Sequence, residues 1–177
     1  EVSASLNEDE TLDTANAPSI TAFDPDGDTL TWSLGSSPSN GVAVLSGTGA
    51  APTTFTYTPN SNFHGTDSFV AMVKDGDLND TVTINLLVSP VNDAPVVTQG
   101  SSVAVTMSEN SSPTAWVVPT LTASDADDDS IEWSLYAAPA NGFASVTGIG
   151  DSPSIFTYWP NNNYSGIDSF IVKASDG

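Results

Sequence analysis

Residues 24–34 read DPDGDTLTWSL, and residues 125–135 read DADDDSIEWSL. The two stretches are 101 residues apart, and the same spacing aligns residues 1–76 with residues 102–177 without a gap. In that register 30 of the 76 aligned pairs are identical. Chance does not hold one register over such a length, so the chain contains a duplicated domain of about 100 residues.

Apolar and polar residues alternate within each copy, which is the period of β-strands. Seven short runs of this kind are separated by Gly, Pro, Asn and Asp, and no helical period is found. In the first copy the residues that share a face in six of these runs are Val2, Ala4 and Leu6; Ile20 and Ala22; Leu30, Trp32 and Leu34; Phe55 and Tyr57; Phe69, Ala71 and Val73; and Val82, Ile84, Leu86 and Val88. The seventh is a shorter run over residues 42–45. This pattern predicts an all-β fold of two tandem Ig-like Greek-key β-sandwiches, with Trp32 and Trp133 in their cores.

A linker is expected where Pro90 and Pro95 bracket a short polar segment. The predicted organisation is a first repeat over residues 1–91, a linker over 92–95 and a second repeat over 96–177. The last run of the first copy, residues 81–88, has no counterpart before Gly177. We therefore expect the second sandwich to lack its last strand, either because the sequence is truncated before that strand or because a neighbouring chain donates it.

The charge balance excludes several classes of partner. The sequence has 22 acidic residues and two basic ones, Lys74 and Lys173, for a formal net charge of −20. Such a surface repels nucleic acid and anionic membranes, and no run of apolar residues is long enough to span a bilayer. Two compatible interpretations remain: the surface recruits cations, or it is adapted to a salty medium.

The residues needed for common catalytic sites are missing. Without Cys, neither disulfides nor thiol catalysis are available. His64 is the only histidine, and Ser165 replaces it in the second copy, so a Ser-His-Asp set is not expected. The acidic residues recur in both copies, which favours an architectural role over glycoside hydrolysis. We predict that the chain is not an enzyme.

Several motifs follow one another along the first copy: DPDGD at residues 24–28, TWSL at 31–34, FTYTPN at 55–60, GTDSF at 65–69, DG at 75–76 and PVNDAP at 90–95. In this order they resemble the bacterial cadherin-like, Ig-like tandem repeats of large surface or secreted proteins. The resemblance covers the first copy fully and the second as far as Gly177. It implies an extracellular or cell-surface location, with neighbouring repeats of the same protein as partners.

The paired acids themselves favour calcium. Asp24 and Asp26 in the first copy, and Asp125 and Asp127 in the second, are spaced so that one loop directs two carboxylates at an ion. Carboxylates this close repel each other unless a cation lies between them. The alternative is that these residues cap turns by accepting hydrogen bonds from nearby backbone N–H groups.

The resemblance to cadherins further implies how a Ca²⁺ site would be assembled at the junction of the repeats. Its ligands would be Glu8 and Asp67 from the first repeat, Asn92 and Asp93 from the linker, and Asp125, Asp127 and Asp176 from the second repeat. Asp24, Asp26 and Asp75 would form the matching part of a site shared with a preceding repeat. The linker reads Asn-Asp where cadherins have Asp-Asn.

Three functions stay open at this point. The first is a calcium-stiffened structural or adhesive repeat of an extracellular bacterial protein. The second is a carbohydrate-binding accessory module of a secreted enzyme. Trp159 is predicted to point outward, where it can stack on sugar rings, pack at an interface or simply be exposed, and a row of exposed aromatic residues would favour this function. The third is a subunit of an extracellular filament in which copies of the chain exchange strands.

Overall fold

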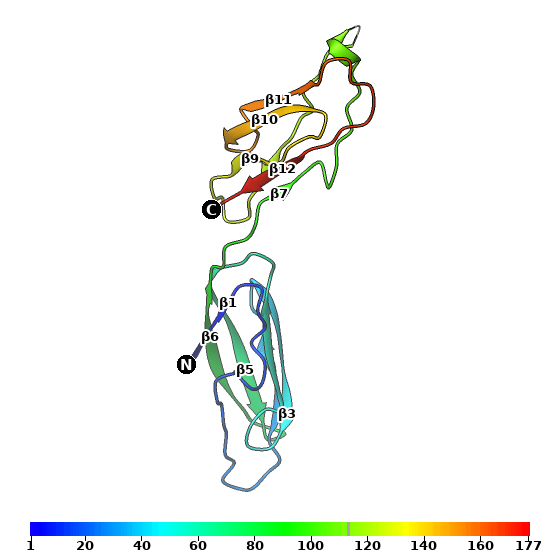
Figure 1. Ribbon diagram of the computed structural model, residues 1–177. Coiled ribbons are helices and arrows are strands. Elements are labelled where there is room, and N and C mark those ends of the chain that lie inside the picture. Colours follow the sequence, from blue (N-terminus) through cyan, green and yellow to red (C-terminus); the bar gives the residue numbers. More distant parts are fainter. Residues whose placement is uncertain (113) are drawn as a thin grey trace. The chain divides into compact units, whose positions relative to one another are not determined.

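The alternating runs of the first repeat form six strands (Figure 1). They are β1 (Val2–Asn7), β2 (Thr31–Ser36), β3 (Gly41–Thr48), β4 (Thr54–Pro59), β5 (Gly65–Lys74) and β6 (Asn79–Ser89). The structure is a computed structural model that describes residues 1–112 and 114–177. It divides into two units, Glu1–Val91 and Asn92–Gly177, and each is described by itself. No helix in these described residues is long and apolar enough to cross a membrane.

The strands of unit 1 join in the order β1-β6-β5-β2-β3-β4. Strand β1 runs parallel to β6, whereas the other neighbours are antiparallel. The outermost strands, β1 and β4, nevertheless contribute Leu6 and Phe55 to the same core cluster. The sheet therefore folds over on itself and closes around one apolar interior, as the predicted sandwich requires.

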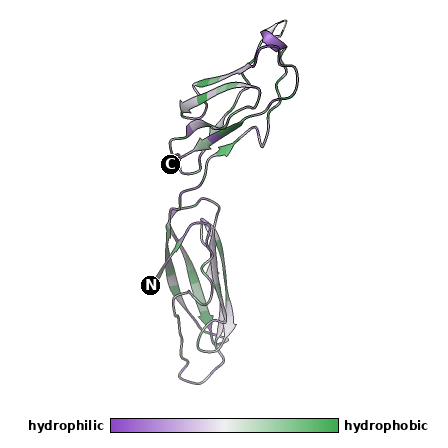
Figure 2. Ribbon diagram, in the orientation of Figure 1, coloured by the Kyte–Doolittle hydropathy of each residue, from purple (hydrophilic) through white to green (hydrophobic). Residues whose placement is uncertain are grey.

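Aromatic residues dominate the core of unit 1. Phe55, Tyr57 and Phe69 are at most 2% exposed, and the Tyr57 and Phe69 rings stack with centroids 6.3 Å apart. Trp32 is buried as predicted, and its indole N–H donates to the Gly49 carbonyl at 2.9 Å. Figure 2 shows the hydrophobic colouring on β5 and β6.

One expected strand of unit 1 does not form, so that prediction was wrong. The run containing Ile20 and Ala22 is irregular, although Ile20 is buried and the Ala22 N–H donates to the Ala50 carbonyl at 2.8 Å. A single hydrogen bond and one buried side chain anchor this segment, but a strand needs a continuous ladder. An alternation over only three residues does not distinguish a β-strand from an irregular segment that buries one side chain.

Unit 2 repeats this plan with fewer paired strands. Its elements are β7 (Val96–Val97), the short 3-10 turn η1 (Glu109–Ser111), β8 (Ala123–Ser124), β9 (Glu132–Ala137), β10 (Gly142–Ile149), β11 (Ile155–Pro160) and β12 (Ile171–Ser175). One sheet has the order β11-β10-β9-β12, and β7 pairs with β8 in a second. Trp133 lies in the core, and its N–H donates to the Gly150 carbonyl at 2.8 Å, just as Trp32 bonds Gly49.

The second sandwich is the less complete one, as the sequence predicted. Strand β12 corresponds to the C-terminal half of β5, yet it is an edge strand. Residues 103–108 are the sequence equivalents of β1, and they form no strand. The all-β class and the tandem Ig-like sandwiches are confirmed in both units.

Candidate metal centre

Three carboxylates converge on the loop that follows β8. Asp125 Oδ1 accepts hydrogen bonds from the backbone N–H groups of Asp127 at 3.0 Å and Asp129 at 3.2 Å. This Asx turn coils the chain tightly, with Asp128 at a positive φ of 59°. As a result, one carboxylate oxygen each from Asp125, Asp127 and Asp129 lies within 4.8 Å of the other two.

The beginning of unit 2 supplies more oxygen-bearing side chains beside this loop. The backbone N–H of Asp93 donates to Asp127 Oδ2 at 2.7 Å. The preceding residue, Asn92, donates its side-chain amide to Asp176 Oδ2 at 2.6 Å. Five of the predicted ligands are thus gathered at one end of unit 2 by these contacts: Asn92, Asp93, Asp125, Asp127 and Asp176.

Asp125 carries the clearest sign of a missing partner. Its Oδ2 is shielded from solvent and has no hydrogen-bond partner among the residues that the structure describes. A carboxylate oxygen removed from water and left unpaired is unfavourable. Within the same described residues the one ion pair joins His64 to Glu8, far from this loop in sequence. The charge of the loop is therefore not neutralised by a basic side chain of unit 2.

The equivalent loop of unit 1 has the same turn but not the same cluster. Asp24 Oδ1 accepts from the N–H groups of Asp26 at 2.9 Å and Asp28 at 3.0 Å. Asp75 Oδ1 accepts from the Leu78 N–H at 2.8 Å and closes the hairpin between β5 and β6. In the described part of this loop, no group of three acids approaches as closely as in unit 2. The Asx turn by itself therefore does not make a cation site.

Comparison with known families assigns both repeats. Residues 1–87 and residues 92–177 each match the family described as the bacterial Ig domain. The chain belongs to the bacterial Ig domain family. Domains of this family are typically non-catalytic modules, usually on extracellular or surface proteins, and two of them in tandem account for the internal repeat.

Two solved structures resemble the chain at low identity. They are the endo-fucoidan hydrolase MfFcnA4 from glycoside hydrolase family 107, at 19% identity and a TM-score of 0.42, and a variant of the same enzyme at 20% and 0.45. Each match covers 99% of this chain but only 25% and 26% of the hydrolase chains, respectively. A likeness at this level carries no statement about activity. A search of curated proteins finds no match.

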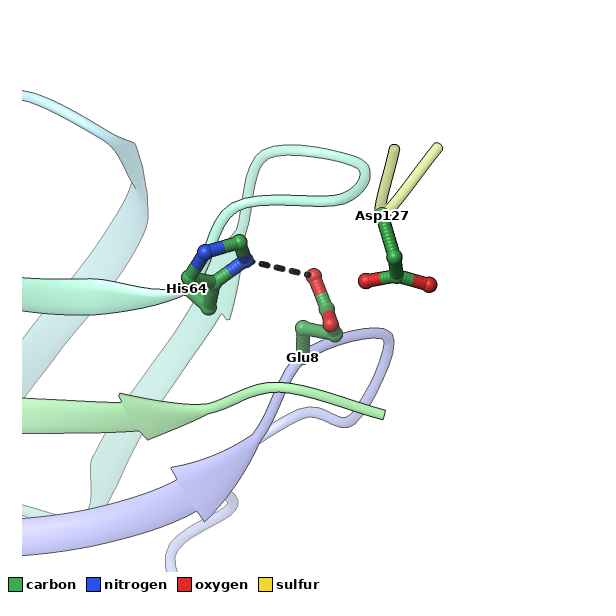
Figure 3. A group of neighbouring side chains, drawn as sticks. All are labelled: Glu8, His64 and Asp127. Atoms are coloured by element: carbon green, nitrogen blue, oxygen red, sulfur yellow. Dashed lines mark ion pairs between the residues drawn. The ribbon is translucent and has the colours of Figure 1, made fainter. Parts of the chain in front are cut away.

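The first bacterial Ig domain contains a buried acid that was predicted as a ligand. Glu8 is 1% exposed, and its Oε1 accepts from the Val91 N–H at 2.7 Å. Its Oε2 lies 3.8 Å from Nδ1 of His64 and has no hydrogen bond in the described residues (Figure 3). His64 is itself half exposed, whereas the Glu8 side chain is almost completely buried.

Asp67 is placed differently from the other predicted ligands. Its carboxylate accepts hydrogen bonds from the N–H groups of Ser39, Asn40 and Ser68 and from the Tyr57 hydroxyl, at 2.8–3.1 Å. Burial alone would raise the pKa of Asp67, but these hydrogen bonds outweigh it and hold the pKa below its ordinary value. Burial, together with the neighbouring carboxylate, raises the pKa of the Tyr57 hydroxyl. Both oxygens of Asp67 are therefore engaged by the protein.

The second bacterial Ig domain repeats this arrangement. Asp168 accepts from the N–H groups of Ala140, Asn141 and Ser169 and from the Tyr158 hydroxyl. Burial and the Asp168 carboxylate raise the pKa of Tyr158 to about 12. The recurrence of Gly-x-Asp in both repeats follows from this role: one carboxylate ties the loop before β3 or β10 to the adjacent strand.

Two residues of interest were not predicted as ligands. Asp129 joins the cluster because the Asx turn draws the fifth residue of the motif inward, a signal already present in the spacing Asp-x-Asp-x-Asp. His64 lies beside Glu8, and no local signal links them, since strand pairing joins residues 56 positions apart in sequence.

Proposed function

We propose that this chain is a non-catalytic, calcium-binding structural or adhesive module of an extracellular protein, with the cation held by the acidic loop of the second domain. The observation that carries the proposal is the convergence of Asp125, Asp127 and Asp129 around the unpaired Oδ2 of Asp125. The proposed donors are completed by Asn92, Asp93 and Asp176. Asp67 is left out, because its oxygens already accept four hydrogen bonds.

The donor chemistry favours calcium over other metals. All proposed donors are oxygens, from carboxylates, an amide and the backbone, and calcium takes six to eight of these in flexible geometry. Zinc prefers His and Cys, of which unit 2 has none. Magnesium demands near-ideal octahedral geometry and usually retains several waters, which suits a flexible multi-carboxylate loop less well.

Binding there would have a mechanical consequence. Asn92 and Asp93 directly follow the first unit, so an ion that takes these residues as ligands also immobilises the segment through which the two domains are connected. The reduced freedom of that segment is what stiffens a tandem array. The same ion offsets part of the formal charge of −20, which otherwise disfavours the compact state.

Thermal melting in chelator and in millimolar calcium tests the proposal. A ligand at about 100 times its dissociation constant stabilises the native state by about 2.7 kcal/mol, so unit 2 should melt several degrees higher with calcium. The double variant Asp125→Asn/Asp127→Asn should lose this shift. Asp24→Asn/Asp26→Asn is the matched control, because it changes the same motif in unit 1, and it should keep the shift. Equal shifts in both variants would contradict the proposed ligand set.

A second candidate function rests on a pair of exposed aromatic side chains. Phe143 of β10 and Trp159 of β11 are cross-strand neighbours on the outer face of unit 2. They are 63% and 54% exposed, with ring centroids 5.9 Å apart and an interplanar angle of 29°. Aromatic faces of this kind stack on pyranose rings. The corresponding residues of unit 1 are Val42 and Thr58, which lack such a surface.

We therefore propose polysaccharide binding at this pair as the alternative role, and the charge of the chain selects neutral rather than sulfated or carboxylated glycans. Affinity electrophoresis in gels containing xylan, laminarin or mixed-linkage β-glucan tests it. Phe143→Ala/Trp159→Ala should abolish any retardation, whereas Val42→Ala/Thr58→Ala, at the matched positions of unit 1, should preserve it. No retardation of the unmodified chain in any of these gels would reject this role.

A further inference from the structure

Three places in the sequence carry the pattern that transferases read when they attach a glycan to asparagine. The pattern is Asn-x-Ser/Thr with x other than proline, and it begins at Asn79, Asn110 and Asn163. It arises easily in a chain rich in Ser, Thr and Asn, so the pattern by itself does not identify an acceptor. The structure separates the three by what their side chains contact.

The Asn79 pattern lies on the hairpin between β5 and β6. The Asp75 carboxylate closes the turn by accepting the Leu78 N–H at 2.8 Å. Asn79 is the first residue of β6 and pairs with Lys74 of β5. Residues 76–81 are all exposed. The acceptor side chain is therefore held at a defined position at the start of a strand and is open to solvent.

Strand geometry directs the two groups that a transferase must read to the same side. Side chains alternate along a strand, so Asn79 and Thr81 project to one face, while Val82 packs against the core on the other. Thr81 donates its backbone N–H to Asp80 Oδ1 at 2.8 Å. In the described part of the chain, no hydrogen bond engages the Asn79 amide or the Thr81 hydroxyl. Both groups are thus free to contact an enzyme.

The two patterns of unit 2 are arranged differently. The side-chain amide of Asn110 donates to Asn163 Oδ1 at 3.3 Å, and Asn110 Oδ1 accepts the backbone N–H of Asn163 at 3.3 Å. Asn110, Ser111 and Asn163 have positive φ values of 53°, 59° and 61°. Left-handed residues bend the chain, so these patterns are not extended as residues 79–81 are. A glycan on either Asn would also have to break its contact with the other.

We propose that Asn79 is an N-glycosylation site whose co-substrate is an oligosaccharide carried on a lipid pyrophosphate. The amide nitrogen of Asn79 would bond to C1 of the first sugar. The bond from C1 to the pyrophosphate oxygen would break, the lipid pyrophosphate would leave with the bonding electron pair, and the nitrogen would lose one proton. The glycan would be bulky and solvated and would cover the neighbouring Leu78, which is 73% exposed. The inference rests on the proposed extracellular location, because export brings a chain to such transferases.

Enzymatic glycosylation of the purified full chain tests the site. The probe is a bacterial oligosaccharyltransferase of the class that also requires an acidic residue two positions before the acceptor, which Asp77 provides, together with its lipid pyrophosphate-linked oligosaccharide. Intact mass should rise by a single glycan, and peptide fragmentation should place it on Asn79. Asn79→Gln and Thr81→Val should each lose the mass increase, and Val keeps a β-branched side chain in the strand. Asn110→Gln/Asn163→Gln is the matched control and should keep it.

A synthetic peptide of residues 73–83 separates recognition of the pattern from its presentation, and both the peptide and the folded chain should be modified. Modification of the peptide alone would overturn the inference, because the hairpin would then withhold the acceptor from the enzyme. Modification of neither, or a glycan on Asn110, Asn163 or Thr81, would overturn it as well. The readout is mass alone, so its failure leaves the calcium proposal unaffected, and a missing calcium-dependent melting shift leaves the glycosylation result unaffected.

Discussion

The two repeats share their local hydrogen bonds but differ in how completely those bonds are enclosed. Trp32 and Trp133 bond equivalent glycine carbonyls, and both Tyr-Asp pairs tie the same loop to the same strand. Yet Phe69 is 1% exposed in unit 1, and Phe170 is half-buried in unit 2. Local geometry follows the shared sequence, while burial follows the presence of the neighbouring strand β6.

The acidic loops of the two repeats also share their local hydrogen bonds, but here unit 2 has the more elaborate arrangement. Both repeats form an Asx turn at the first Asp of the motif, but only the turn of unit 2 has Asn92 and Asp93 beside it. Of the two turns, as the structure describes them, only that of unit 2 brings three carboxylates together. The difference teaches that a motif supplies candidate ligands, whereas the segment beside it decides whether they face one another.

The largest expected difference between the repeats is in core truncation. Phe69→Ala should destabilise unit 1 by about 3–5 kcal/mol, because a fully buried aromatic side chain leaves a cavity. Phe170→Ala should destabilise unit 2 by less than about 2 kcal/mol, since part of that ring is already in water. Hydrogen exchange under native conditions measures each unit separately, with Val42→Ala as the exposed control. Equal losses in the two units would mean that Phe170 is as fully buried in solution as Phe69.

Removing the carboxylate that ties loop to strand should have the next largest effect. Asp67→Ala leaves the Tyr57 hydroxyl and the N–H groups of Ser39 and Asn40 without their acceptor, so unit 1 should lose about 2–4 kcal/mol. Asp168→Ala should cost unit 2 about half as much, because water reaches the groups it leaves behind. Denaturant unfolding monitored by hydrogen exchange measures the loss of stability in each unit separately. A larger loss for Asp168→Ala than for Asp67→Ala would contradict the expectation that the groups around Asp67 are the more deeply buried ones.

The same carboxylates predict an acid dependence. Because the folded-state pKa of Asp67 lies below its unfolded value, the unfolded state binds the proton first, and the stability from this group is present above about pH 4 and lost as pH falls through the folded pKa. The free energy of unfolding of unit 1 should therefore fall less steeply in Asp67→Ala than in the unmodified chain below about pH 4. Parallel pH profiles for the two proteins would show that Asp67 is not held ionised by its hydrogen bonds.

Removal of a single hydroxyl should give the smallest effect. Tyr57→Phe deletes one donor to Asp67 and leaves its three backbone donors, so unit 1 should lose about 1–2 kcal/mol. Tyr158→Phe should cost unit 2 about 1 kcal/mol or less, since solvent can replace the lost hydroxyl. The same native-state hydrogen exchange measures both, and Tyr136→Phe, at an exposed position, should change nothing. A loss above that of Asp67→Ala would place the energy in the tyrosine packing instead.

Much of the site was predictable because the motif acids are local in sequence. The spacing of Asp125 and Asp127 was sufficient to predict that one turn brings them together, and the outward position of Trp159 followed from alternation. Its stacking partner Phe143 was not predicted, because that contact depends on the register of β10 against β11. The strand expected at Ile20 and Ala22 failed for a similar reason, since a partner strand, and not alternation, decides whether a short run forms a ladder.

By itself the sequence determined the duplication, the all-β class and the buried tryptophans, because these depend on period-two alternation and on one repeated register. The tertiary structure decided which acids are committed to the fold and which are left with unpaired oxygens. Asp67 and Asp125 look alike as acids in a turn-rich sequence, but strand pairing surrounds Asp67 with four donors and leaves Asp125 Oδ2 with none in the described residues. Hydrogen-bond satisfaction depends on groups distant in sequence, and only the folded chain brings them together.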